Sequence, residues 1–119
     1  MIDHVALPVT NLERSRRFYE DALAPLGRDV MMEWPGGVLY TLGGGGMLAL
    51  RESEQVVPIH LAFGADRAGV HAFHEAALAA GADDNGEPGL RADYHADYYA
   101  AFVRDPDGHN IEAVCHKPE

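Results

Sequence analysis

The sequence predicts an α+β domain in which one module, a strand followed by a helix and about three strands, occurs twice. Three observations support this fold class. The chain has 119 residues, 47% hydrophobic and 24% charged, which is the composition of an ordinary soluble domain with a single core. Two amphipathic helical segments each follow a short apolar run. Glycine- and proline-rich turns then separate the strand-like pieces that come after each helix.

The first module opens with a strand-like run over 2–9. Thr10 and Glu13 have the spacing of a capping box, and apolar side chains then recur at a helical period until Pro25. Three strand-like pieces follow, DVMMEW, VLYTL and MLALRE. The four consecutive glycines of 43–46 predict a hairpin tip between the last two pieces.

The second module repeats this plan. The run PIHLAF is strand-like, and the segment DRAGVHAFHEAALAAG places Val70, Phe73 and Ala77 on one helical face before Gly81 ends it. Strand candidates follow around Leu90 and in YYAAFVR and NIEAVCH. The two modules align with His4 on His60 and with Ala49 on Glu112, which indicates an internal repeat.

The turn at 105–108, DPDG, fixes which side chains of the last two strands share a face. We expect a type I turn with Gly108 as a left-handed bulge, because glycine readily takes a positive φ. Phe102 then pairs with Glu112, and Tyr98 lies on the same face. A two-residue turn would instead bring Tyr99 and Val103 onto that face.

Alternation along the strands groups His4, His60 and Glu112 on comparable faces. In each strand the neighbouring residues form a more apolar face, which we expect to pack beneath the helices. The two imidazoles and the carboxylate would then lie on the concave side of a curved sheet. Such a set could hold a divalent iron, manganese, nickel, cobalt or zinc ion with positions open to substrate. The ordinary alternatives are strand histidines bound to backbone groups and a half-exposed strand glutamate.

The other histidines have weaker patterns. His71 and His74 lie three residues apart, a spacing that allows a metal pair, but a solvated helix face is the favoured interpretation. His95 lies among tyrosines before a strand and could overhang a cleft as an acid or base, with aromatic packing in a surface loop as the alternative. Tyr98 is a candidate pocket phenol. His109 is assigned to the turn.

The charge and the cysteine content exclude several classes of partner. Nine basic and nineteen acidic residues give a net charge of −10, which argues against sequence-independent binding of nucleic acid or anionic membranes. The partner is expected to be a small molecule or another protein. The single cysteine cannot form an internal disulfide, and neither a signal peptide nor a membrane-spanning run is evident. We therefore expect a cytoplasmic protein.

Three motifs resemble the vicinal oxygen chelate superfamily, which includes glyoxalase I, extradiol dioxygenases, fosfomycin-resistance thiol transferases and bleomycin-resistance proteins. The run IDHVALPVTNLERSRRFYEDAL is similar to the opening of that family, IHLAF to its midpoint and FVRDPDGHNIEAV to its closing hairpin. The resemblance implies one domain over 1–119, with modules at about 1–57 and 58–119, that forms a partly closed barrel of mixed sheet. It also implies a homodimer and a divalent metal ion held by His4, His60 and Glu112.

One position departs from glyoxalase I. That enzyme has a fourth glutamate ligand where this chain has Ala49, and Glu52 has the opposite strand parity. The three-ligand set is more similar to the dioxygenases and the fosfomycin-type transferases. The resemblance thus implies a metal-dependent enzyme: a lyase or isomerase, a dioxygenase or a thiol transferase. Its metal ion would chelate two adjacent oxygens of a small, oxygen-rich substrate, and His95 or Tyr98 would move a proton. The alternatives are a bleomycin-resistance-like protein that sequesters a small molecule without turnover and a domain that keeps the metal as a structural relic.

Overall fold

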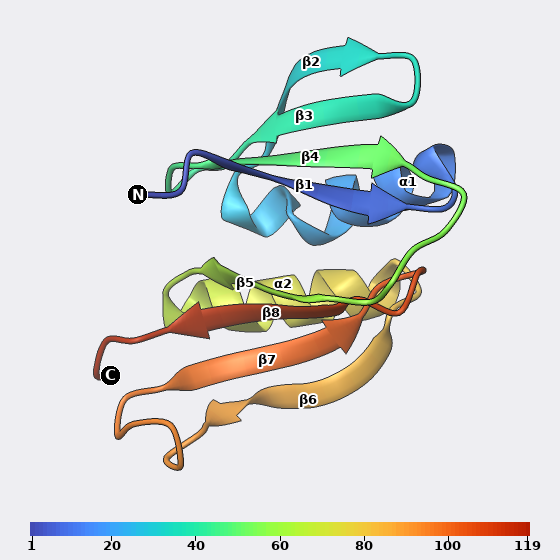
Figure 1. Ribbon diagram of the computed structural model, residues 1–119. Helices are drawn as coiled ribbons and strands as arrows, with labels where there is room; N and C mark the ends of the chain where they lie inside the picture. The colour runs from blue at the N-terminus through green and yellow to red at the C-terminus, as the bar shows by residue number, and fades with distance from the viewer.

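The computed structural model describes residues 1–119 and contains the predicted repeat (Figure 1). The first module consists of β1 (His4–Val9), α1 (Leu12–Ala22), a short 3₁₀ helix η1 (Ala24–Leu26), β2 (Asp29–Trp34), β3 (Gly37–Thr41) and β4 (Met47–Glu52). The second consists of β5 (His60–Gly64), α2 (Arg67–Ala79), β6 (Asp83–Leu90), β7 (Tyr99–Arg104) and β8 (Asn110–Cys115). The predicted α+β fold class is confirmed.

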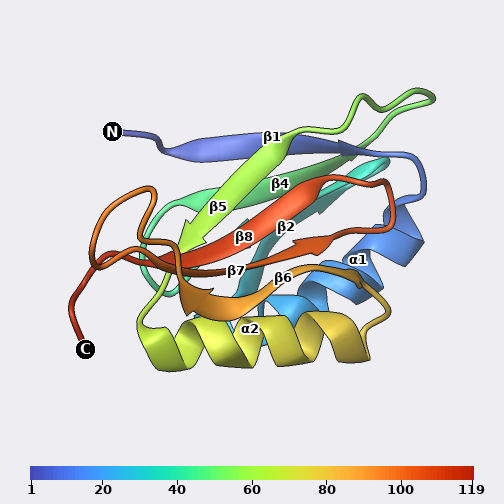
Figure 2. The same ribbon diagram turned by 90° about the horizontal axis from the view of Figure 1, so that it is seen from below.

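Each module forms one mixed four-stranded sheet. The strand orders are β1-β4-β3-β2 and β5-β8-β7-β6. The first strand of each module runs parallel to the last, and the remaining pairs are antiparallel. The two sheets are not hydrogen-bonded to each other, so no barrel closes within one chain. Both helices lie on the same side of the strands (Figure 2).

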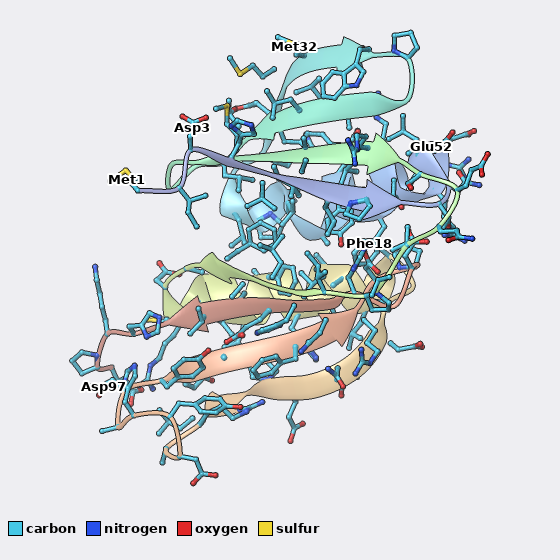
Figure 3. All side chains as sticks on the ribbon, viewed as in Figure 1. Met1, Asp3, Phe18, Met32, Glu52 and Asp97 are labelled. Carbon is cyan, nitrogen blue, oxygen red and sulfur yellow. The ribbon has the colours of Figure 1, made fainter.

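One hydrophobic core spans both modules on the helix side of the sheets. Leu7 of β1, Phe63 of β5 and Ile111 of β8 belong to it, as the alternation of side chains predicted. The helices contribute Phe18 and Phe73, and α1 packs against α2. Phe18, labelled in Figure 3, is 3% exposed. Because this core covers one face of each sheet, the opposite faces remain available for a site.

Helix α1 begins differently from the predicted capping box. Its N-cap is Asn11, whose side chain accepts the backbone N–H of Arg14 at 3.0 Å. Thr10 instead donates its hydroxyl to the carboxylate of Asp107, which also accepts from the Thr10 N–H and from Arg14. Glu13 pairs with Arg17. The capping-box prediction was wrong because a carboxylate from the second module binds the threonine.

The turn between β7 and β8 fastens the second module to the first. Asp105 accepts the hydroxyl of the buried Tyr19 and the backbone N–H groups of Asp107 and His109. Burial, together with this carboxylate, raises the pKa of Tyr19 well above its usual value. The DPDGH sequence is therefore both a hairpin turn and a contact between modules.

His109 completes this contact and is fully buried. Its Nδ1 accepts the backbone N–H of Ile59 at 3.0 Å, and its Nε2 donates to the carbonyl of Pro8 at 2.8 Å. The end of β1 is thereby tied to the residue that precedes β5. We call Asp105, Asp107 and His109 the clasp.

Strands β1 and β5 are edge strands of the two sheets; they run in roughly opposite directions and at an angle to each other (Figures 1 and 2). The clasp joins the end of β1 to the start of β5. At the other end, Asp3 and Val5 line a mainly apolar cavity of about 290 Å³ together with Leu61 and Gly64. This antiparallel arrangement fixes how far apart the histidines of the two strands lie.

Candidate metal centre

The second sheet presents a group of predicted site residues on the face opposite α2. Glu112 of β8 is paired with Ala62 of β5 on one side and with Phe102 of β7 on the other. These three residues form one row across the sheet. Gly108 has a φ of 85°, as the predicted bulge requires. The predicted register of the last hairpin is confirmed.

His60 and Glu112 meet in this row. His60 Nε2 lies 2.9 Å from Glu112 Oε1, and His60 Nδ1 lies 2.9 Å from the carbonyl oxygen of Asn110. A carbonyl can only accept, so Nδ1 carries the proton of the imidazole. In the neutral ring Nε2 then carries a lone pair, and this lone pair points at a carboxylate oxygen. Such a contact is favourable only when a proton or another cation lies between the two atoms.

Tyr98 holds the other oxygen of the same carboxylate. Its hydroxyl donates to Glu112 Oε2. Burial and this hydrogen bond to the carboxylate raise the pKa of Tyr98 to about 12, so the phenol keeps its proton at neutral pH. Glu112 is only 1% exposed. His60 lies at one of its carboxylate oxygens and Tyr98 at the other.

His95 lies one layer farther out. Its Nδ1 accepts the backbone N–H of Asp97, so its Nε2 donates to Nδ1 of His116 at 2.9 Å. The His95 ring also contacts the edge of the Tyr98 ring, with a centroid separation of 5.4 Å. Both imidazoles are exposed. The structure therefore brings His95 near the phenol without placing it on Glu112.

His4 lies away from the other two predicted ligands. Its Nδ1 contacts Asp3 Oδ1 at 2.8 Å, and its side chain is 59% exposed. His60 is the first residue of β5, and this end of β5 is tied through His109 to Pro8, near the end of β1. His4 lies four residues before Pro8, which corresponds to roughly 13 Å along the strand. Figure 3 places Asp3 at the opposite end of β1 from the loop after Glu52. Within one chain, no three His, Cys, Asp or Glu side chains are close enough to hold a metal.

Ala49 in the first sheet occupies the position of the fourth carboxylate ligand that this chain lacks. Ala6 pairs with Ala49 as Ala62 pairs with Glu112, so Ala49 and Glu112 are equivalent in the repeat. Glu52 accepts the backbone N–H of Leu12 at 2.9 Å and thereby serves the start of α1. The first module supplies no carboxylate at this position of the row.

The helix histidines are bound separately. His71 Nε2 lies 2.6 Å from the hydroxyl of Tyr99, and His74 Nε2 lies 2.9 Å from Asp84 Oδ1. The hydrogen bond from His74 lowers the pKa of Asp84. His71 and His74 thus have different partners. His71 is exposed, as expected of a solvated helix face, but that prediction was wrong for His74, which is buried at 8% exposure because its ring lies against β6.

Sequence reasoning placed Phe102 opposite Glu112 but missed Arg91 as a residue of this face. The guanidinium carbon of Arg91 lies 5.3 Å from the centroid of the Phe102 ring. That ring is stacked on His60 at 6.1 Å. The available signal was the pair of glycines at 86 and 89, which leave open space in the strand before Arg91.

Comparisons with known proteins agree with this architecture. The family model for the Glyoxalase/Bleomycin resistance protein/Dioxygenase superfamily matches residues 1–113. The chain belongs to this superfamily. A glyoxalase/bleomycin resistance protein from Albidiferax ferrireducens T118 has a similar structure, with a TM-score of 0.84, 30% identity and 99% coverage of both chains.

Two further relatives are more distant. The metallothiol transferase FosB of Shouchella clausii (strain KSM-K16) is 29% identical over 115 residues, which is 93% of this chain and 77% of that protein. A glyoxylase/bleomycin resistance protein/dioxygenase domain from Frankia sp. EAN1pec has a TM-score of 0.75 at 20% identity, with 98% of each chain covered, and shares the fold.

Neither α1 nor α2 has the length and the continuous apolar surface that a membrane-spanning helix needs.

Proposed function

We propose that the protein is a metal-dependent enzyme whose divalent ion, iron, manganese, nickel, cobalt or zinc, is held by His60 and Glu112 of one chain and by His4 of a second copy. A small substrate would bind the remaining positions through two adjacent oxygens. The observation that carries this proposal is the contact between His60 Nε2 and Glu112 Oε1, in which two metal-ligating atoms are directed at one point.

The hydrogen bonds of both histidines suit metal binding. Nδ1 of His60 donates to the carbonyl of Asn110, and Nδ1 of His4 contacts the carboxylate of Asp3. In each case Nε2 keeps a lone pair for a ligand bond. Histidines that bind metals usually have their second nitrogen fixed by an oxygen in this way.

Two copies are proposed because one chain separates His4 from His60. The first sheet also leaves apolar side chains in solvent on the face away from the helices. Met32 on β2 is 54% exposed and Trp34 is 38% exposed. A second copy related by a two-fold axis can cover this face and place its first module beside the second module of its partner. Such a homodimer contains two equivalent sites.

Each residue of the proposed site has a defined task. Tyr98 orients Glu112 through its hydroxyl and remains protonated, so it suits donation of a proton better than removal of one. The exposed His95 and His116 pair can exchange a proton with solvent beside this phenol. When bound, a divalent ion supplies Lewis acidity toward chelated substrate oxygens. One carboxylate against a doubly charged ion leaves a net positive centre, which favours an oxygen-rich anionic ligand.

Elemental analysis of purified protein tests this proposal. We expect about one ion per chain in the wild type and loss of that ion in His60→Ala. His71→Ala removes an exposed helix histidine whose ring is hydrogen-bonded to Tyr99 and not to Glu112, so this variant should keep the metal. Metal content that is unchanged in His60→Ala would contradict the assignment.

Turnover separates an enzyme from a sequestering protein. Hemithioacetals, catechols and epoxides with a thiol cover the reaction classes of the superfamily that the resemblance implies. Multiple turnovers with one of these classes support the enzyme. Tight stoichiometric binding of a small molecule by metal-free protein, without conversion, would favour sequestration instead.

A further inference from the structure

The guanidinium of Arg91 lies on the same face of the second sheet as His60 and Glu112, in a space that two glycines leave open. A Cβ at Gly86 would lie 3.1 Å from Nη2 of Arg91, and one at Gly89 would lie 3.3 Å from Nη1. Gly86 also has a φ of 150°, which side chains rarely allow. The strand is thus shaped to let an arginine lie close against it.

Hydrogen bonds within the chain hold this guanidinium in place. Nη1 donates to the carbonyl of Gly89 at 2.9 Å, and Nη2 donates to the carbonyl of Glu87 at 2.8 Å. The cation also packs over the ring of Phe102. Arginine has five N–H donors, so three remain after these two bonds.

Arg91 has no carboxylate partner although the chain is strongly acidic. The net charge is −10, and Arg14, Arg16, Arg17 and Arg67 each lie within ion-pair distance of a carboxylate. Arg28, Arg51, Arg91 and Arg104 form no such pair. Of these, Arg91 is half-buried and packs over the ring next to His60. A fixed, partly desolvated guanidinium without an anion is suited to bind one, because its planar fork matches a carboxylate.

Phe102 lies between Arg91 and the proposed metal ligands. Its ring stacks on His60 at 6.1 Å with an interplanar angle of 28°, and its backbone pairs with Glu112. This face therefore presents, in order, the metal-ligating pair, a flat ring and a fixed cation. A planar molecule with adjacent oxygens at one end and a carboxylate at the other matches that order.

We infer that Arg91 binds a carboxylate of the substrate, and that the substrate class is a small aromatic or planar acid with two adjacent oxygens. This inference rests on the proposed function for its chelating end. The carboxylate end can be tested alone, because it requires only Arg91 and Phe102.

The first experiment titrates benzoate into metal-free protein and follows the arginine Nε–H resonances by heteronuclear NMR. We expect a saturable shift of the Arg91 signal and none of the signal from Arg17, an exposed arginine on α1. In Arg91→Gln the binding of benzoate is lost, in Arg91→Lys it weakens, and in the control Arg17→Gln it is unchanged. Absence of an Arg91 shift in the wild type would overturn the inference whatever the metal content.

The second experiment compares catechol with 3,4-dihydroxybenzoate on cobalt-loaded protein without oxygen. These probes differ only by the carboxylate. We expect the acid to bind about tenfold tighter to the wild type and to Arg17→Gln, since a charge-assisted hydrogen bond contributes this much, and the preference to disappear in Arg91→Gln. A preference that persists in Arg91→Gln, or equal binding in the wild type, refutes the role of Arg91. Failure of cobalt to bind refutes the proposed function, and the benzoate titration then decides the role of Arg91.

Discussion

Nε2 of His60 and Oε1 of Glu112 lie 2.9 Å apart, with the only proton of the neutral imidazole committed to the carbonyl of Asn110. In the metal-free protein this contact requires a shared proton. A divalent ion that takes the place of this proton satisfies the same two atoms. The geometry thus couples metal binding to proton release.

We predict that binding of zinc releases about one proton per site near neutral pH. Titration calorimetry in buffers of different ionisation enthalpy measures this number. In Glu112→Gln the amide N–H can donate directly to His60 Nε2, so the shared proton and its release disappear and zinc binds more weakly. Zinc binding by the wild type without any proton release would contradict the shared-proton geometry.

Tyr98 provides a pH-dependent test of its contact with Glu112. Its pKa in the folded protein is about 12, above the value of about 10 for a free phenol. Its contribution to stability is therefore complete below about pH 10 and is lost as the pH rises toward 12. The ultraviolet absorbance of phenolate, taken as the difference between wild type and Tyr98→Phe, reports this titration.

In Glu112→Gln the pKa of Tyr98 should fall toward 10 without reaching it, because burial still disfavours the phenolate. Tyr99→Phe is the matched control, since the Tyr99 hydroxyl contacts His71 and not Glu112. An unchanged Tyr98 titration in Glu112→Gln would mean that the hydrogen bond to the carboxylate does not hold the phenol.

The sequence predicted the elements of each module and the facing of their side chains, because these depend on local patterns. The alternation around His60 and the glycine at 108 were sufficient for the register of the last hairpin. The separation of His4 from His60 could not be predicted in this way. It results from contacts such as His109 to Pro8, which join residues 101 positions apart. The glycines at 86 and 89 mark the place where Arg91 lies against its strand, but the contact of its guanidinium with the ring of Phe102, on the neighbouring strand, follows only from the fold.

The clasp should contribute strongly to stability. In His109→Ala a fully buried side chain is removed, and the backbone N–H of Ile59 and the carbonyl of Pro8 lose their partner. We expect the free energy of unfolding to fall by about 3 kcal/mol, measured by urea denaturation. His71→Ala removes an exposed histidine and should cost less than about 1 kcal/mol. Equal effects of the two substitutions would show that His109 does not join the modules.

Ala49→Glu tests the equivalence of the two modules in the proposed site. The added carboxylate would lie where Glu112 lies in the second module. Zinc binding, measured by competition with a chelator, should tighten by roughly tenfold or more because a further charged ligand is available. The metal-free variant should unfold at a lower temperature, since the carboxylate is buried without a partner. Ala49→Gln should show much less of the gain in affinity, and an Ala49→Glu protein with unchanged affinity would place Ala49 outside the site.

The shared site makes the heterodimer of two defective chains the most direct test. One chain carries His4→Ala, and the other carries His60→Ala with Glu112→Ala. A two-fold dimer of these chains contains one site with all three ligands and one site with none. After co-expression and separation of the heterodimer by two affinity tags, we predict about one tightly bound ion per dimer, whereas neither homodimer retains metal against a chelator. A heterodimer that holds no more metal than the two homodimers would contradict a site built from both chains.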